Sequence, residues 1–239
     1  GNFVALFSSC CKSYILLLAF KQKAVRAILK PIGGKQDLHE RKVSIAVPAS
    51  VVSDTPHLRE KTSKIGLIGR TAAIFKVDGI MVYPDNPKAS QTQEMDLIAL
   101  LLSYMETPQY LRKRLFKLEP ELRYAGILPP LRTAHHPLNR RMEKLRIGEY
   151  REGVLLSRKL EGTLVDIGVE QPALIVGKHL PAGKRITVKI KRIAKQIEVE
   201  LTSRDEIPEY WGYIVARQEQ PFGKIVKSRN FDLTIGTSR

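Results

Sequence analysis

The spacing of apolar residues changes twice along this chain, and that change restricts its fold more than any other feature. From about residue 43 to residue 106, short apolar runs alternate with stretches in which apolar residues recur every three or four positions. From about residue 150 to residue 204, apolar and charged residues alternate one by one, and after Pro208 short apolar runs return. The first spacing favours helices packed on one side, and the second favours strands with one dry face. The sequence therefore predicts an α/β domain that is interrupted by an inserted β unit.

The first part of the chain predicts a β-α-β-α order. The runs VSIAVPAS (43–50) and GIMVYPDN (79–86) have the length and the β-branched content of buried strands. Thr55 and Pro56 mark the start of a helix that is expected to run to about Lys76, because threonine caps helices and proline suits the first helical position. A second helix is indicated by Met95, Ile98, Leu102 and Met105, and a short one over 108–116. This order favours a parallel sheet with helices packed on it.

The middle part predicts a small barrel. In KRITVKIKRI (184–193), Ile186, Val188 and Ile190 alternate with threonine and lysine, and QIEVELT (196–202) alternates in the same way with glutamate. With the apolar runs before them, about five short strands fit into residues 150–204, which is enough for a small antiparallel barrel. After Pro208, YWGYIVA (210–216) and FDLTIGTS (231–238) are expected to be buried strands, with a short helix over 221–228 between them.

The charge of the chain favours an anionic partner. The 40 Lys and Arg residues outnumber the 24 Asp and Glu residues by 16, and residues 111–159 alone hold thirteen cations and five carboxylates. Such a cluster can neutralise RNA phosphates, although the alternative is an ordinary solvated surface. The interleaved Tyr110, Tyr124, His135 and His136 could stack on unpaired bases. The predicted RNA-binding residues are Arg112, Lys113, Arg114, Arg132, His135, His136, Arg140, Arg141, Lys144 and Arg146.

The cysteines and the start of the chain give weaker indications. Cys10 and Cys11 are the two cysteines and are adjacent, so neither a disulfide scaffold nor a cysteine-rich zinc site is expected. The adjacent His135 and His136 lack a third ligand nearby, and no metal site is predicted. The chain begins with glycine and its first methionine is Met81, so residues 1–42 are interpreted as a doubtful extension. We rank three interpretations of this segment. A gene-start artefact comes first, a basic surface helix from about Tyr14 second and a membrane anchor third.

Five segments resemble those of a known methyltransferase family. KIGLIGRTAAIFKVDGIMVY (64–83) resembles the first motif of the SpoU branch of the SPOUT methyltransferases, and DLTIGTSR (232–239) resembles the start of the second. TPQYLRKRLF (107–116), AGILPPLRTAHHP (125–137) and EYWGY (209–213), in that order, are similar to the archaeal and eukaryotic SPOUT RNA methyltransferases that carry an OB-like insertion. The resemblance covers residues 43–239.

The resemblance implies a fold, a donor and a set of site residues. It implies a SPOUT α/β domain over 43–126 and 207–239 with a deep trefoil knot, an OB-like barrel over 127–206, S-adenosylmethionine as the methyl donor, RNA as the acceptor and a homodimer with a shared active site. Arg70 matches the motif arginine and is the catalytic candidate, with a solvated surface arginine as the alternative. The donor-binding candidates are Thr234, Ile235, Gly236, Thr237 and Ser238. An ordinary strand-ending turn is the alternative for Gly236.

Two departures from the family pattern qualify this prediction. Lys64 stands where many SpoU proteins have an asparagine. The family continues beyond the position of Arg239 with the loops and the helix that complete the knot, so we expect this chain to be a truncated and inactive fragment of its parent.

The predicted function is therefore S-adenosylmethionine-dependent methylation of a base in rRNA or tRNA, by a cytoplasmic protein. The alternative is a non-catalytic RNA-binding protein that uses the OB-like insertion, and a membrane-attached protein has the least support. The sequence contains no serine triad, GxGxxG or GK[ST] loop that would favour a hydrolase, a dehydrogenase or an NTPase.

Overall fold

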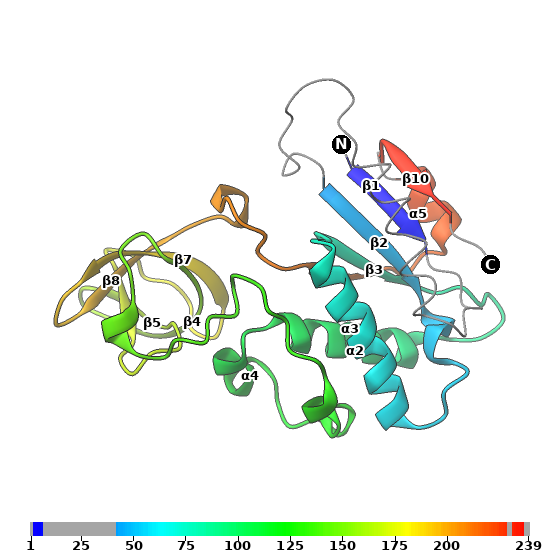
Figure 1. Ribbon diagram of the computed structural model, residues 1–239, viewed down its shortest axis with the longest axis horizontal. Coiled ribbons are helices and arrows are strands. Elements are labelled where there is room, and N and C mark those ends of the chain that lie inside the picture. Colours follow the sequence, from blue (N-terminus) through cyan, green and yellow to red (C-terminus); the bar gives the residue numbers. More distant parts are fainter. Residues whose placement is uncertain (1, 7–41, 229–230, 237–239) are drawn as a thin grey trace. The chain divides into compact units, whose positions relative to one another are not determined.

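The computed structural model describes residues 2–6, 42–228 and 231–236, and these fall into two compact units (Figure 1). The sheet unit comprises Gly1–Lys64, Phe75–Leu100 and Tyr213–Arg239, and the barrel unit comprises Ile65–Ile74 and Leu101–Gly212. Two helices, α2 (Leu58–Ile74) and α3 (Thr92–Glu106), begin in the sheet unit and end in the barrel unit. The predicted boundaries at residues 126 and 206 stay a prediction.

The sheet unit is built on a parallel sheet of five strands in the order β10-β1-β2-β3-β9. The strands are β1 (Asn2–Leu6), β2 (Lys42–Pro48), β3 (Gly79–Tyr83), β9 (Ile214–Arg217) and β10 (Leu233–Ile235). This confirms the parallel sheet that the β-α-β-α order predicted. Strand β1 was not predicted, because it lies in the segment interpreted as a doubtful extension. The surface helix expected from about Tyr14 lies outside the described residues.

Both faces of this sheet are apolar at its strands β2 and β3. The edge strands β9 and β10 were expected to be buried, but their residues are exposed or half-buried. Ala46 of β2 is in register with Met81 of β3, and both pack with Tyr83 against Ile225 of the short helix α5 (Phe222–Ser228). The residues that alternate with them point to the other face and are also buried: Ile45, Val47, Ile80 and Val82. A parallel sheet that is covered on both faces needs such continuous apolar strands, which is why β2 and β3 read as unbroken runs in the sequence.

The helices lie close to their predicted positions. Helix α2 begins at Leu58, slightly after the expected cap at Thr55, and Thr62 Oγ1 donates a hydrogen bond to the Leu58 carbonyl in its first turn. Helix α3 is amphipathic, with Met95 and Ile98 buried in its first half. A short 3-10 turn, η2 (Ala49–Val52), follows β2 directly.

The barrel unit contains a closed barrel of five strands in the order β4-β5-β6-β8-β7. Its strands are β4 (Tyr150–Lys159), β5 (Gly162–Asp166), β6 (Ala173–Val176), β7 (Arg185–Ile193) and β8 (Ile197–Leu201). Helix α4 (Gln109–Leu115) precedes the barrel, with the 3-10 turns η3 (Pro120–Leu122), η4 (Ala125–Ile127) and η5 (Met142–Lys144), and η6 (Arg204–Glu206) follows it. The prediction of an all-antiparallel barrel is wrong in one respect: β6 and β8 close the barrel as a parallel pair.

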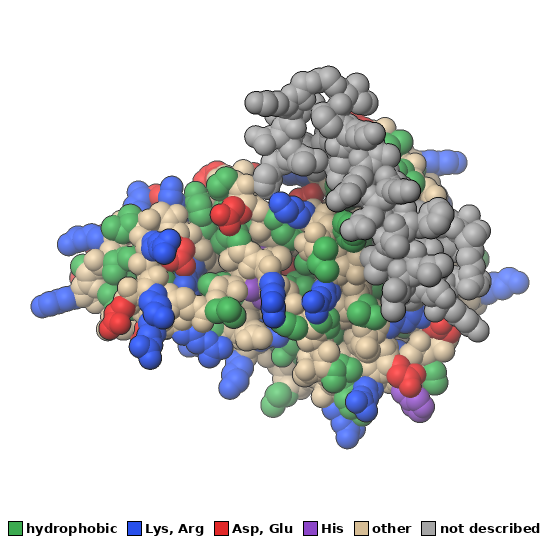
Figure 2. Space-filling view, in the orientation of Figure 1, with side chains coloured by type: hydrophobic (Ala, Val, Ile, Leu, Met, Phe, Trp, Pro, Cys, Tyr) green, Lys and Arg blue, Asp and Glu red, His purple; other side chains and the backbone are tan. Residues whose placement is uncertain are grey.

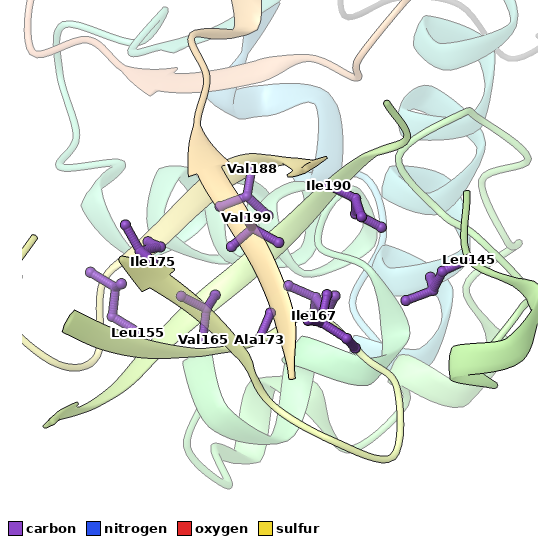
Figure 3. Close-up of a cluster of buried hydrophobic side chains, with 10 residues drawn as sticks. Leu145, Leu155, Val165, Ile167, Ala173, Ile175, Val188, Ile190 and Val199 are labelled. Carbon is purple, nitrogen blue, oxygen red and sulfur yellow. The ribbon is translucent and has the colours of Figure 1, made fainter. Parts of the chain in front are cut away.

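The inward-facing residues of all five strands form one apolar core (Figure 3). Val188 and Ile190 of β7 are buried, whereas Lys189 between them is half-buried and Lys191 is exposed, as the one-by-one alternation requires. The register of β7 against β8 shifts between Ile190 and Arg192, and Arg192 is exposed as well. Leu145, which lies before the first barrel strand, also belongs to this core and is 7% exposed. The segment that carries Leu145 is held in place by a hydrogen bond from Gly148 N to the Ile190 carbonyl. The basic residues around Leu145 are therefore fixed to the barrel.

Candidate functional site

The predicted donor-binding segment lies at the end of an edge strand of the sheet. Thr234 and Ile235 belong to β10, which pairs with β1, and Gly236 follows the strand. Thr234 and Gly236 are exposed and Ile235 is half-buried. Thr237 and Ser238 lie outside the described residues. A glycine at the carboxyl end of a parallel strand leaves the backbone open, and ligands of parallel α/β sheets bind at this edge.

The carboxyl ends of β2 and β3 are joined by a hydrogen-bonded cluster that the sequence did not reveal. The carboxylate of Asp85 accepts hydrogen bonds from the Ser50 N–H (3.0 Å), the Ser50 hydroxyl and the Gln91 amide nitrogen (3.0 Å). Gln91 Oε1 in turn accepts from the backbone N–H groups of Asp85 and Asn86, each at 2.9 Å. These bonds order the loops at the same edge of the sheet at which β10 ends, because all the strands are parallel.

Lys64, which stands where many SpoU proteins have an asparagine, has a partner within the sheet unit. Its Nζ lies 2.6 Å from Asp54 Oδ1, and this hydrogen bond lowers the pKa of the Asp54 carboxyl. The pair links the middle of α2 to the turn that precedes the helix.

Arg70 is exposed near the end of α2, within the barrel unit. Leu67 and Ile74 on the same helix are 52% and 65% exposed, so the arginine lies among unusually exposed apolar side chains. One turn earlier, Gly66 packs so closely on the loop before Leu131 that an added Cβ would lie 2.8 Å from Pro129 Cδ. In the described part of the chain, no ion pair holds the Arg70 guanidinium. It is therefore available to an anionic ligand.

Seven of the predicted RNA-binding cations have exposed side chains: Lys113, Arg114, Arg132, Arg140, Arg141, Lys144 and Arg146. The last four lie in or next to η5, which packs on the barrel through partly buried Met142 and is followed by the buried Leu145. Figure 2 shows lysine and arginine side chains projecting from the surface over the barrel strands. This surface can carry several phosphate contacts.

Two of the predicted cations have structural partners. Arg112 donates from Nε to the Thr107 carbonyl (2.9 Å) and from its second guanidinium nitrogen to the Met105 carbonyl (3.1 Å), and it lies over the Tyr104 ring. These contacts satisfy carbonyl groups at the end of α3. Arg114 forms a 2.6 Å ion pair with Asp166 of β5 and keeps half of its side chain exposed. Arg112 thus stabilises the fold rather than presenting a free cation.

The prediction for the histidines needs correction. His135 is completely buried and His136 is partly buried, and their Nε2 atoms lie 2.9 and 2.8 Å from the Glu106 carbonyl oxygen. Burial lowers the pKa of each imidazole to about 4, so both are neutral at pH 7. A neutral, buried His135 cannot stack on an RNA base in this conformation. The cause is the packing of this turn against the end of α3, which the sequence pattern does not contain.

Tyr110, which was also expected to stack on bases, has a structural role as well. Its hydroxyl donates a 2.8 Å hydrogen bond to the Glu152 carbonyl, and burial raises its pKa. Its ring lies against Gly168, where an added Cβ would be 2.4 Å from the ring atoms. Tyr110 therefore fastens α4 to the barrel strand β4.

A buried ionic network lies within the barrel unit, and sequence reasoning missed it. Glu106 and Glu152 are 6% and 1% exposed, and Arg185 bridges them with 2.6 Å contacts to each carboxylate. Arg204 lies 3.1 Å from Glu106, and the Trp211 indole N–H donates to Glu152 at 2.6 Å. These five residues come from α3, β4, β7, η6 and the segment after it. The network holds the end of α3 and residues 204–211 to the barrel.

Two other kinds of site are absent from the described residues. No helix there is long and apolar enough to cross a membrane. No group of three or more His, Cys, Asp or Glu residues in that same part of the chain could hold a metal ion.

The sequence model of the family described as "Putative RNA methyltransferase" matches residues 42–239, which is most of the chain. The chain belongs to this family. The match begins at the first residue of β2 and includes the α/β segments and the barrel. Family membership confirms the RNA methyltransferase family that the motifs indicated, and the SPOUT class stays a prediction.

Relatives of this family member come from animals, fungi and archaea. The human 28S rRNA (uridine-N(3))-methyltransferase is 30% identical over 222 residues, which cover 82% of the chain and 57% of the human protein. The Drosophila melanogaster protein of the same name is 33% identical over 227 residues, with 82% and 46% covered. An uncharacterized Halobacterium salinarum protein is 33% identical over 151 residues, with 62% and 52% covered. The chain spans about half the length of the curated relatives it matches.

Proposed function

We propose that this chain is part of an enzyme that transfers a methyl group from S-adenosylmethionine to a base of ribosomal RNA. The observation that carries the proposal is the family membership across residues 42–239. The relatives named as 28S rRNA (uridine-N(3))-methyltransferases favour the N3 atom of a uridine as the acceptor. The exposed cations of the barrel unit supply the RNA affinity that such an enzyme needs.

The described residues fit one part of a donor-binding loop. Thr234, Ile235 and Gly236 lie at the carboxyl end of a parallel strand, and the exposed glycine lets a ligand approach the backbone. When bound there, S-adenosylmethionine supplies a methyl group on a sulfonium sulfur. The ordered loops held by Asp85 lie at the same edge of the sheet and support the placement of a ligand there.

The chemistry of the acceptor explains what the protein residues have to do. N3 of uridine lies on the pairing edge of the base, so the base must be unpaired before it can react. N3 gives up its proton to water as the bond to the methyl carbon forms, and the carbon–sulfur bond of the donor breaks to leave a neutral thioether. The negative charge that loss of the proton develops on N3 spreads to the two neighbouring carbonyl oxygens. We assign Arg70 to this charge or to the adjacent phosphate, because its guanidinium is exposed, permanently charged and suited to bidentate binding.

We also propose the finer features of the family for this chain. A five-stranded barrel with a non-sequential strand order supports an OB-like assignment, and OB-folds commonly bind oligonucleotides. The SPOUT class and a homodimer follow from the resemblance of the motifs around Arg70 and Gly236, as does a trefoil knot in the parent protein. The alternative function, an RNA-binding protein without catalysis, is favoured by the barrel and its basic surface.

A methyl-transfer assay distinguishes the two functions. The protein is expressed from its native gene with any flanking residues, and transfer of a tritiated methyl group to large-subunit rRNA and to tRNA is measured. We expect labelled N3-methyluridine in rRNA, and we expect Arg70→Ala to reduce the rate at least about 100-fold with little effect on donor affinity. Arg59→Ala, at an exposed position of the same helix, is the matched control. RNA binding without any label would support the non-catalytic alternative.

A further inference from the structure

We propose that one end of the barrel, the barrel tip, binds an unpaired stretch of RNA. The barrel tip comprises residues 158–161, at the turn between β4 and β5, and residues 176–184, which connect β6 to β7. The proposal rests on the proposed RNA substrate. Most of the barrel tip, residues 160–161 and 176–184, lies outside the basic stretch of residues 111–159.

The first observation is that the tip lysines have no carboxylate partners. The tip holds four cations, Arg158, Lys159, Lys178 and Lys184, and a single carboxylate, Glu161. In the part of the chain that the structure describes, no ion pair involves these four. On the side of the same barrel, by contrast, Lys191 is paired with Glu200 at 2.6 Å and Arg192 with Glu198 at 3.2 Å. The tip is therefore a region of the barrel where positive charge is uncompensated.

The second observation is an apolar contact point among these charges. Leu160 is 98% exposed and Val176, at the end of β6, is 56% exposed. Val176 is in register with Gly162, two residues after Leu160. Water-exposed aliphatic side chains ringed by lysines can cover the face of an unpaired base while the lysines contact the flanking phosphates.

The third observation is that the tip backbone is fixed. Thr163 Oγ1 donates to the Lys178 carbonyl (2.6 Å) and accepts from Leu180 N–H (2.9 Å). Gly177 N–H donates to the Glu161 carbonyl (2.9 Å), which ties the two tip segments together. Arg158 Nε donates to the Leu180 carbonyl (3.2 Å). Binding would thus order side chains and little backbone, which lowers its entropic cost.

Charge complementarity selects RNA as the occupant. A protein partner for such a surface would need an acidic, apolar patch, whereas a single RNA strand offers a phosphate on either side of every base. Three of the four tip cations are exposed lysines, which bind phosphates as mobile point charges and tolerate any sequence. The geometry therefore points to a single strand that is held with little sequence preference, leaving base selection to the methyl-transfer site.

The test compares two pairs of substitutions that remove the same charge. Lys159→Gln with Lys178→Gln changes the tip, and Lys191→Gln with Arg192→Gln changes the paired cations on the side of the barrel. Binding of the full protein to a fluorescent 20-nucleotide oligouridine is measured from about 50 to 200 mM salt. We expect the tip pair to weaken binding about tenfold at low salt and to reduce the salt slope by about 1.4, since each phosphate contact on a single strand contributes about 0.7. The control pair should change the binding affinity and the salt slope only slightly.

A second pair of variants tests the apolar contact. Leu160→Ser should weaken binding about fivefold without changing the salt slope. Leu118→Ser, at another fully exposed leucine of the barrel unit, is the control. Photo-crosslinking with 4-thiouridine in the oligonucleotide should label residues 158–161 or 176–179.

The outcomes separate this proposal from the proposed function. If both double variants weaken binding equally, or the tip variants bind as the unaltered protein does, the tip is not the contact surface, although rRNA methylation can still be observed. If an acidic protein competes as well as the oligonucleotide and no crosslink forms at the tip, the assignment of RNA is overturned. Loss of methyl transfer to rRNA with normal oligonucleotide binding would instead contradict the proposed function alone.

Discussion

Replacing Glu152 with alanine should destabilise the barrel unit more than any surface change. Glu152 is 1% exposed and accepts hydrogen bonds from Arg185 Nε (2.6 Å), Thr187 Oγ1 (2.8 Å) and the Trp211 indole nitrogen (2.6 Å). Removing one partner of a buried ion pair costs about 3–5 kcal/mol. Arg185 keeps its contacts to Glu106, which limits that loss, but the donors of Thr187 and Trp211 lose their acceptor at about 1 kcal/mol or more each. We expect a total of about 4 kcal/mol.

Trp211 makes this prediction directly measurable. It is the single tryptophan of the chain and contacts Glu152, so its fluorescence reports unfolding of the network in urea. Glu152→Gln, which keeps one acceptor oxygen, should cost about half as much as the alanine variant. The control is Glu198→Gln, whose exposed pair with Arg192 should contribute at most about 0.5 kcal/mol. A loss below about 1 kcal/mol for Glu152→Ala would refute the role assigned to the network.

Two further predictions concern pH and backbone geometry. Because burial holds the pKa of His135 and of His136 at about 4, below the unfolded value of about 6.5, the unfolded chain binds more protons between these values. Stability should therefore fall by a few kcal/mol as the pH drops from 7 to 4, and urea titrations of a His135→Gln, His136→Gln variant should show a flatter pH dependence. Gly168 has a positive φ and lies against the Tyr110 ring, so Gly168→Ala should cost about 3 kcal/mol by urea unfolding; Gly183→Ala, with a similar φ and open space around it, should cost only about 1 kcal/mol. Equal losses at the two glycines would show that the ring contact is unimportant.

Local spacing of apolar residues was enough to predict most elements of the fold. The alternation in residues 184–202 predicted β7 and β8. Successive side chains of a strand point to opposite faces, so a strand with one buried face alternates apolar and polar residues. The continuous apolar runs predicted β2 and β3 as buried parallel strands. The local spacing of apolar residues does not determine which strands pair, however. The parallel pair of β6 and β8, and the place of β1 between β10 and β2, depend on segments that are far apart in the chain.

The candidate site divides in the same way. The excess of cations is a property of composition, so the sequence could predict a surface for RNA, and exposed residues such as Arg140 and Lys144 remain consistent with it. The sequence could not show that Arg112 caps α3, or that His135 lies buried at Glu106. Glu106 and Arg185 are 79 residues apart, and neither has a neighbour that reveals the other. Burial and partners of a polar side chain are decided by which surfaces meet in the folded chain, and only tertiary packing determines that.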